Sequence, residues 1–253
     1  MPLTLCLSSI ACGARLPKLP EGPGVPLADP NAVWSSATTS CYGIKTLSAE
    51  VGVSGRTGGR GLRARVLAGA AHPSSIRLEA LAPFGPPVFV LVATPDRSEL
   101  YLPRDRRILS GSPTADIVEA LTGVRLAADD LRALLGGCPV PDPRPVGARM
   151  LGDTWRAVDL ENGATAYFQL LNGVWHLVAA TRGTLVMHFD QFDDQRPARI
   201  RLQTPGASLT LSLSQTEVNT PLGEEVFRIS VPPDADPLTL QQLREAGPLG
   251  GRN

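Results

Sequence analysis

Short runs in the first half of the chain place apolar residues at every second position, separated by turn-forming residues. The pattern occurs at Leu47–Val53, Leu62–Val66 and Ile76–Ala80, and Leu100–Leu102 is a further short run. Val88–Val92 differs because it is apolar on both faces. Alternation with period two is typical of a strand with one buried face. Because the runs recur about every dozen residues, they predict a meander of antiparallel strands.

The second half of the chain resumes the same pattern. Asn162-Gly163 and Asn172-Gly173 lie between apolar segments, and this dipeptide tolerates the positive φ angles of tight hairpin turns. The predicted strands here are Trp155–Leu160, Ala164–Leu170, Val174–Ala180, Thr184–Phe189, Arg199–Gln203 and Ser208–Val218, followed by an edge strand at Phe227–Val231.

Helical patterns interrupt and flank the predicted strands. Asp29 can cap the first helix, Pro113 suits the first turn of the second, and Gly123 is a suitable end for it. The four expected helices are Ala32–Cys41, Pro113–Gly123, Asp129–Leu135 and Thr239–Ala246. The fold class is therefore mainly β with a central helical insert.

Composition and charge indicate a chain that can form a hydrophobic core and that does not bind nucleic acid. The chain has 253 residues, of which 43% are hydrophobic, enough to build a real core. Its 24 basic and 24 acidic residues give a formal net charge of zero, and they are scattered singly. A surface that binds nucleic acid needs an excess of Lys and Arg, so no nucleic-acid partner is expected.

The N-terminal segment resembles the end of a bacterial lipoprotein signal peptide. Met1–Ala11 is apolar and uncharged, and the small residues Ser9 and Ala11 flank Ile10 just before Cys12. Cys12 is therefore the predicted lipid-anchor residue, and residues 1–30 are interpreted as a signal remnant followed by a flexible tether rich in Pro and Gly. The alternative is an ordinary disordered N-terminus that contains a cysteine.

The remaining cysteines form an even pair. Cys6 would leave with the signal segment and Cys12 would be lipidated, which leaves Cys41 and Cys138. A disulfide between them would close a loop of nearly a hundred residues and contribute on the order of 4 kcal/mol in the chain-entropy model. The alternative is two buried free thiols. No Cys/His cluster has the spacing of a zinc site, so no metal is expected.

Two blocks of sequence resemble a known family. Ile76–Gly85 reads as an apolar strand followed by Ala82-Pro83-Phe84-Gly85, and Glu119–Val124 contains a Leu-Thr-Gly turn that precedes the Leu-rich segment Leu131–Gly137. In order and spacing these blocks are similar to the outer-membrane lipoprotein insertase (LolB-like) family, within the wider LolA/LolB-like lipoprotein-carrier superfamily. From Phe227 onward the chain is closer to periplasmic carriers and other lipid-binding lipoproteins.

The resemblance implies that residues 31–253 form one lipid-binding domain. Its fold would be a strongly curved antiparallel half-barrel sheet, with helices covering the concave mouth and an apolar cavity between them. Pro83, Phe84 and Gly85 would form a loop that inserts into the membrane, whereas the residues alone favour a Phe84 ring that folds back on the core. The expected cavity lining is Leu62, Val66, Ile76, Leu78, Leu100, Leu102, Leu121, Leu131, Leu134 and Leu135. The same residues would also fit an ordinary filled core.

The implied function is to receive lipoproteins from a periplasmic carrier and insert them into the outer membrane. The protein would be a lipid-anchored monomer on the periplasmic face, with acyl chains as its ligands and no cofactor. The alternatives are a general lipid-binding envelope lipoprotein and a structural or interaction module. An enzyme is not expected, because His72, His176 and His188 lie on different elements and no nucleophile motif accompanies them.

Overall fold

The computed structural model describes residues 18–193 and 196–247. The first seven strands are β1 (Val25–Pro26), β2 (Thr46–Thr57), β3 (Arg60–Ala71), β4 (Ser75–Leu81), β5 (Phe89–Ala93), β6 (Ser98–Leu102) and β7 (Arg107–Ser110). The others are β8 (Pro145–Leu151), β9 (Trp155–Leu160), β10 (Thr165–Leu171), β11 (Val174–Arg182), β12 (Leu185–Asp193), β13 (Arg196–Gln203), β14 (Ala207–Val218) and β15 (Asp236–Pro237). The helices are α1 (Pro30–Tyr42), α2 (Thr114–Thr122), α3 (Ala128–Leu135), the 3-10 helix η1 (Glu224–Phe227) and α4 (Leu240–Ala246).

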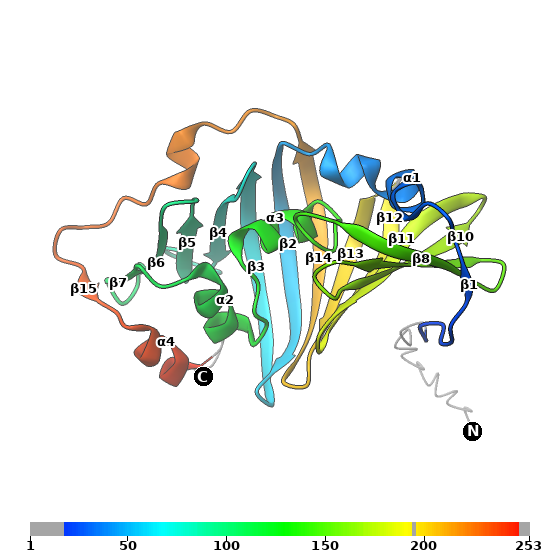
Figure 1. The fold of residues 1–253 in the computed structure, drawn as a ribbon. Coiled ribbons are helices and arrows are strands. Elements are labelled where there is room, and N and C mark those ends of the chain that lie inside the picture. Colours follow the sequence, from blue (N-terminus) through cyan, green and yellow to red (C-terminus); the bar gives the residue numbers. More distant parts are fainter. Residues whose placement is uncertain (1–17, 194–195, 248–253) are drawn as a thin grey trace, which may run out of the picture.

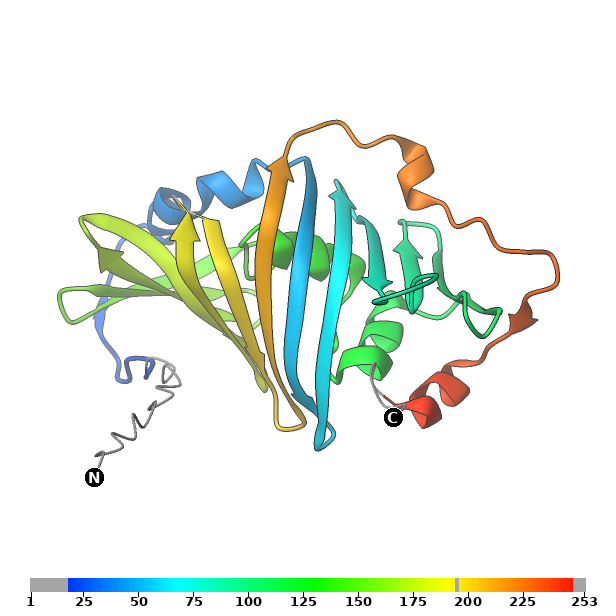
Figure 2. The same ribbon diagram turned by 180° about the vertical axis from the view of Figure 1, so that it is seen from behind.

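The described strands form one strongly curved sheet. Their order is β1-β8-β9-β10-β11-β12-β13-β14-β2-β3-β4-β5-β6-β7-β15, and every neighbouring pair is antiparallel except β15 with β7. Figure 1 looks onto the concave side, where α1, α2 and α3 lie, and Figure 2 shows the long central strands from behind. The prediction of a mainly β protein with a curved antiparallel sheet is confirmed.

The centre of the sheet is a pairing between distant segments. β14 pairs with β2 from Ala207 opposite Thr57 to Val218 opposite Leu47, with one irregularity near Ser214. This pairing joins the meander before the helical insert to the meander after it. Because side chains alternate along a strand, the matched register puts the apolar positions of both halves on the same concave face.

Local sequence explains where the helices on that face begin and end. The Asp29 carboxylate accepts a hydrogen bond of 3.0 Å from the backbone N–H of Ala32, as expected of an N-cap. Gly123 ends α2 with a φ of 75°, a left-handed conformation that favours glycine. The Asp130 carboxylate accepts from the backbone N–H of Ala127 at the start of α3.

The first helix is fastened to the end of the helical insert. Cys41 and Cys138 are disulfide-bonded in the structure, with their Cα atoms 5.6 Å apart. The Tyr42 hydroxyl donates a hydrogen bond of 2.9 Å to the carbonyl of Val140, and burial raises the pKa of this phenol. Trp34 of α1 packs edge-on against Phe168 of β10. The helix α1 therefore packs against the curved part of the sheet that β8 to β12 form.

The C-terminal segment differs from the expectation. The edge strand predicted at Phe227–Val231 is wrong: Phe227 ends η1, and the residues after it are not a strand. The Phe227 ring packs against Val90 and Val92 of β5 instead. β5 is therefore covered on both faces, which explains why its sequence lacks alternation. Arg77 donates hydrogen bonds to the carbonyls of Val226 and Arg228 and fixes this covering segment.

Four strands were absent from the sequence prediction, among them the two-residue β15. β7 has only four residues, and β8 follows a proline-rich stretch that reads as a loop. β1 lies within the segment predicted to be a flexible tether, but Val25 and Pro26 pair with Met150 and Arg149 of β8. The predicted lipid-anchor residue Cys12 lies outside the described residues.

Replacing Phe227 with alanine tests whether the C-terminal segment is structural. We expect Phe227→Ala to lower the free energy of unfolding by about 3 kcal/mol, because it removes a buried ring from the outer face of β5. The matched control is Phe84→Ala, since Phe84 is 90% exposed and its truncation should change stability by less than about 0.5 kcal/mol. Urea denaturation measures both, and equal effects would contradict this role.

Candidate lipid-binding cavity

An apolar cavity lies between the insert helices and the concave face of the sheet. Its volume is about 90 Å³. Seventeen residues from β2, β3, β4, β5, β13, β14, both insert helices and their connection line it. They are Val51, Val53, Leu62, Ala64, Val66, Leu78, Phe89, Val118, Thr122, Val124, Leu126, Leu131, Leu134, Leu135, Leu202, Leu209 and Leu211.

The chemistry of the cavity suits a hydrocarbon ligand. Among the described residues that line it, none has a charged side chain, and Thr122 is the one with a polar side chain. The Thr122 hydroxyl donates to the carbonyl of Val118 at 2.7 Å and accepts from the backbone N–H of Val124 at 3.2 Å. Because this hydroxyl is already paired, the wall offers a ligand van der Waals contact and no hydrogen bond.

The structure brings together part of the predicted cavity lining. Leu62, Val66, Leu78, Leu131, Leu134 and Leu135 line the cavity. Ile76, Leu100 and Leu121 are fully packed into the core instead, and Leu102 packs against its edge. These four are not among the residues that line the cavity in the structure, and their predicted role in the lining stays a prediction.

The contribution of β13 and β14 to the cavity wall was not predicted from the sequence. Leu202 of β13 and Leu209 and Leu211 of β14 reach the cavity because β14 pairs with β2. Their alternation was visible in the sequence, but alternation does not reveal which strands become neighbours. Val51, Val53 and Ala64 had a clearer signal, since they share an alternating face with predicted lining residues.

The helix α3 is attached at both sides of the concave mouth. Arg132 Nε donates a hydrogen bond of 2.8 Å to the carbonyl of Pro73 in the β3–β4 turn. At the other side, Arg182 at the end of β11 pairs with Asp130 at 2.6 Å. Both attachments are polar and partly exposed, whereas the leucines of α3 face the cavity. The helix therefore covers the cavity as a lid with polar edges.

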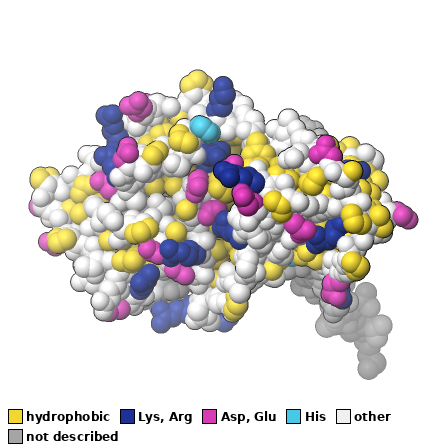
Figure 3. Space-filling model, viewed as in Figure 1, with side chains coloured by type: hydrophobic (Ala, Val, Ile, Leu, Met, Phe, Trp, Pro, Cys, Tyr) yellow, Lys and Arg dark blue, Asp and Glu magenta, His cyan; other side chains and the backbone are white. Residues whose placement is uncertain are grey.

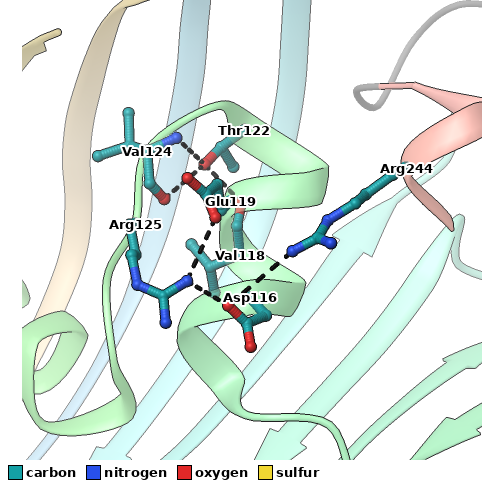
Figure 4. Close-up of polar contacts among 7 residues, drawn as sticks. All are labelled: Asp116, Val118, Glu119, Thr122, Val124, Arg125 and Arg244. Atoms are coloured by element: carbon teal, nitrogen blue, oxygen red, sulfur yellow. Dashed lines mark hydrogen bonds and ion pairs between the residues drawn. The ribbon is translucent and has the colours of Figure 1, made fainter. Parts of the chain in front are cut away.

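The helix α2 is held by a cluster of charges beside the cavity (Figure 4). Arg125 pairs with Asp116 and lies 3.3 Å from the Glu119 carboxylate, so it joins the loop after α2 to the first turns of that helix. The hydrogen bond and charge of Asp116 raise the pKa of the Arg125 guanidinium. Arg244 of α4 reaches the same carboxylate at 4.0 Å. The C-terminal helix is thus linked to the cover of the cavity.

Two glycines permit the insert to approach the sheet closely. A β-carbon at Gly123 would overlap the hydroxyl of Thr57, a buried residue at the end of β2. A β-carbon at Gly137, which has a φ of 83°, would lie 2.6 Å from Cδ of Pro197 on β13. Glycine is therefore required after each of the two insert helices by positive φ and by contact.

The loop between β4 and β5 presents Phe84 to solvent. Its side chain is 90% exposed, the largest value among the exposed large hydrophobic residues of the described chain. Arg104 of the β6–β7 turn donates hydrogen bonds to the carbonyls of Phe84 and Pro86, at 2.9 and 3.4 Å. Gly85 has a φ of 77°, and Pro83 precedes the ring. The predicted membrane-insertion loop is therefore an ordered projection with its aromatic ring outward.

Surface charge on the concave side is mixed. Figure 3 shows basic and acidic side chains interspersed with apolar ones, without a large area of one sign. Among the described residues, no three His, Cys, Asp or Glu side chains group together as a metal site would require. Within those residues, no helix is long and apolar enough to span a membrane.

Comparison with known proteins establishes the fold. No protein-family model and no curated protein sequence matches the chain. A LolA superfamily protein from Nitrosomonas europaea has a similar structure, with a TM-score of 0.54 and 10% identity over 80% of this chain and 99% of that one. A DUF1329 family protein from Desulfovibrio piger gives a TM-score of 0.53 and 13% identity over 79% and 98% of the chains. The fold is thus LolA-like, and the narrower LolB-like resemblance stays a prediction.

Replacing Gly123 tests the close approach of α2 to the sheet. Gly111 has a φ of 78°, nearly that of Gly123, but open space where a β-carbon would be, so Gly111→Ala isolates the cost of the left-handed backbone. We expect Gly111→Ala to cost about 1–2 kcal/mol and Gly123→Ala about 2 kcal/mol more, because the added methyl group overlaps Thr57. Thermal and urea unfolding measure this difference, and equal losses would contradict the contact.

Proposed function

We propose that the protein binds acyl chains of lipids in the cavity beneath α2 and α3. The observation that supports this most strongly is a lining in which the one polar side chain, that of Thr122, is paired within its own segment. Sites for polar ligands place unpaired donors or acceptors toward the ligand, and this wall has none. A saturated hydrocarbon requires no such group.

The size of the cavity requires the cover to move. An apolar cavity of roughly 150 Å³ accommodates benzene, so about 90 Å³ admits only a short part of an acyl chain. Binding a whole chain therefore requires α2 and α3 to shift away from the sheet. The pairs Arg182–Asp130 and Arg125–Asp116 at their edges are partly exposed, and such ion pairs contribute only about 0–1 kcal/mol each. The cover can open without a large loss of polar interactions.

The exposed Phe84 supports a more specific role at a membrane. Burying such a ring in the interface would stabilise the bound state by about 1.5–3 kcal/mol. The ring is held outward by the hydrogen bonds of Arg104, so docking requires little ordering of the loop. We propose that the protein is an outer-membrane lipoprotein, anchored through Cys12 on the periplasmic face, that receives lipoproteins from a periplasmic carrier and inserts them.

The alternatives differ in which of these features they use. A general lipid-binding envelope lipoprotein would use the cavity but not Phe84, and a structural module would use neither. In each case the protein acts by binding and not as an enzyme.

Filling the cavity should weaken lipid binding without loss of stability. We expect Ala64→Leu to weaken binding of a fluorescent long-chain fatty acid at least about 10-fold, because the larger side chain occupies the free volume. Arg63→Leu is the matched control, since the neighbouring side chain is exposed on the strand's other face. Fluorescence titration measures affinity and thermal unfolding measures stability. If wild-type protein binds no fatty acid, the cavity is only a packing defect.

Replacing Phe84 separates the insertase from a simple lipid carrier. We expect Phe84→Asp to reduce association with vesicles of phosphatidylethanolamine and phosphatidylglycerol at least about 10-fold, since a charge replaces the ring in the interface. Phe84→Leu should retain most of it. Vesicle flotation measures association, and transfer of a purified lipoprotein to the same vesicles measures insertion. Undiminished transfer by Phe84→Asp, with fatty-acid binding intact, would leave the general lipid-binding function and exclude the proposed insertion loop.

A further inference from the structure

A second hollow lies at the rim of the sheet, beside the C-terminal end of α1. This open groove has a volume of about 730 Å³ and lies among α1 and the ends of β11, β13 and β14. Its walls include Ser40, Ile44, His176, Arg196 and Asn219. Among the described residues that line it there is no carboxylate, so the groove has a cationic side chain and no anionic one.

Two polar nitrogens in this groove lack partners. Nη1 of Arg196 and Nδ1 of His176 are both buried, and neither forms a hydrogen bond within the described part of the chain. A buried polar atom without a partner costs free energy, and the cost is greater for a charged group. Burial lowers the pKa of His176, so its imidazole is neutral near pH 7 and the positive charge of the pair is that of Arg196. Asp193 is the register partner of Arg196, and among the described residues no ion pair joins the two.

A third, smaller pocket shares one wall residue with the groove and one with the apolar cavity. This pocket of about 140 Å³ has both Leu135 and Arg196 in its lining. Leu135 also lines the cavity, and Arg196 also lines the groove. An acyl chain that passes Leu135 would bring its polar end to Arg196, beside the exposed carboxylate of Asp193, which also lines this pocket. The hydrocarbon part of the ligand would contact leucines, and its polar end would meet the unpaired nitrogens.

We infer that Arg196 and His176 form a headgroup site for a lipid oxyanion, a phosphate or carboxylate, whose acyl chain lies in the cavity. This inference rests on the proposed lipid binding and specifies its ligand class as anionic amphiphiles. A guanidinium matches the geometry of phosphate and carboxylate oxygens, and the imidazole N–H can donate a further hydrogen bond. Partial burial strengthens this charge-assisted contact, because solvent screens it less.

Chemically matched probes test the site. Hexadecyl phosphate, hexadecanol and inorganic phosphate are titrated below micellar concentration by calorimetry, against wild-type protein and the variants Arg196→Gln, His176→Phe and Arg63→Gln. We expect wild-type protein to prefer hexadecyl phosphate over hexadecanol by about 10- to 100-fold, the contribution of hydrogen bonds to a charged group. Arg196→Gln should remove this preference and leave hexadecanol affinity unchanged. His176→Phe should reduce it, and the exposed control Arg63→Gln should retain it.

Each of the other possible results of this titration would contradict a different part of the proposal. If hexadecyl phosphate and hexadecanol bind equally to wild-type protein, or Arg196→Gln keeps the preference, the headgroup site is wrong while acyl binding stands. If inorganic phosphate alone binds as tightly as hexadecyl phosphate, the groove is an anion site unconnected with the cavity. If neither amphiphile binds to wild-type protein, the proposed function itself fails. Hexadecanol binding by Arg196→Gln also verifies that this variant is folded. Hexadecanoate in place of hexadecyl phosphate distinguishes a carboxylate from a phosphate headgroup.

Discussion

The pairing of β14 with β2 is the interaction on which the rest of the structure depends. It joins strands about 160 residues apart in sequence and makes one continuous sheet from two meanders. Its register places Leu211 opposite Val53, and Leu209 and Leu211 line the cavity together with Val51 and Val53. A curved face of this kind is apolar and must be covered, and the insert between the two meanders supplies the cover. The cavity exists because two short helices cover this wide face without filling it completely.

The same arrangement explains how polar and apolar roles are divided. The helices of the insert turn their leucines to the cavity, while Arg132, Asp130 and Arg125 hold their outer edges. The described cavity wall thus has no unpaired hydrogen-bonding side chain, and the attachments lie where water can replace them. Arg196 differs from these attachments, since it has an unpaired nitrogen in a groove next to a smaller pocket that Leu135 also lines. An amphiphile with an anionic headgroup would contact the apolar cavity wall with its acyl chain and pair with Arg196 through its headgroup.

Much of this architecture was predictable from local sequence. Alternation identified the strands around Val51, Val66 and Leu78, and Gly123 marked the end of α2 where the structure has it. The contribution of Leu202 could not be foreseen, because alternation gives the face of a strand and not its neighbour. Val88–Val92 lacked alternation for a tertiary reason: Phe227 covers its outer face. Periodicity also could not distinguish a hollow interior from a filled one, and it therefore placed Ile76 and Leu100 in the lining.

The central claim, that hydrocarbon binds between the insert helices and the sheet, can be tested most directly by NMR. Protein with labelled Leu and Val methyl groups would be studied with ¹³C-labelled palmitate. The account predicts nuclear Overhauser contacts from the acyl methylenes to the methyl groups of Leu78 on the sheet and Leu134 on the lid, both of which line the cavity. Contacts confined to exposed residues such as Val25 and Val146, with none to Leu78 or Leu134, would contradict it.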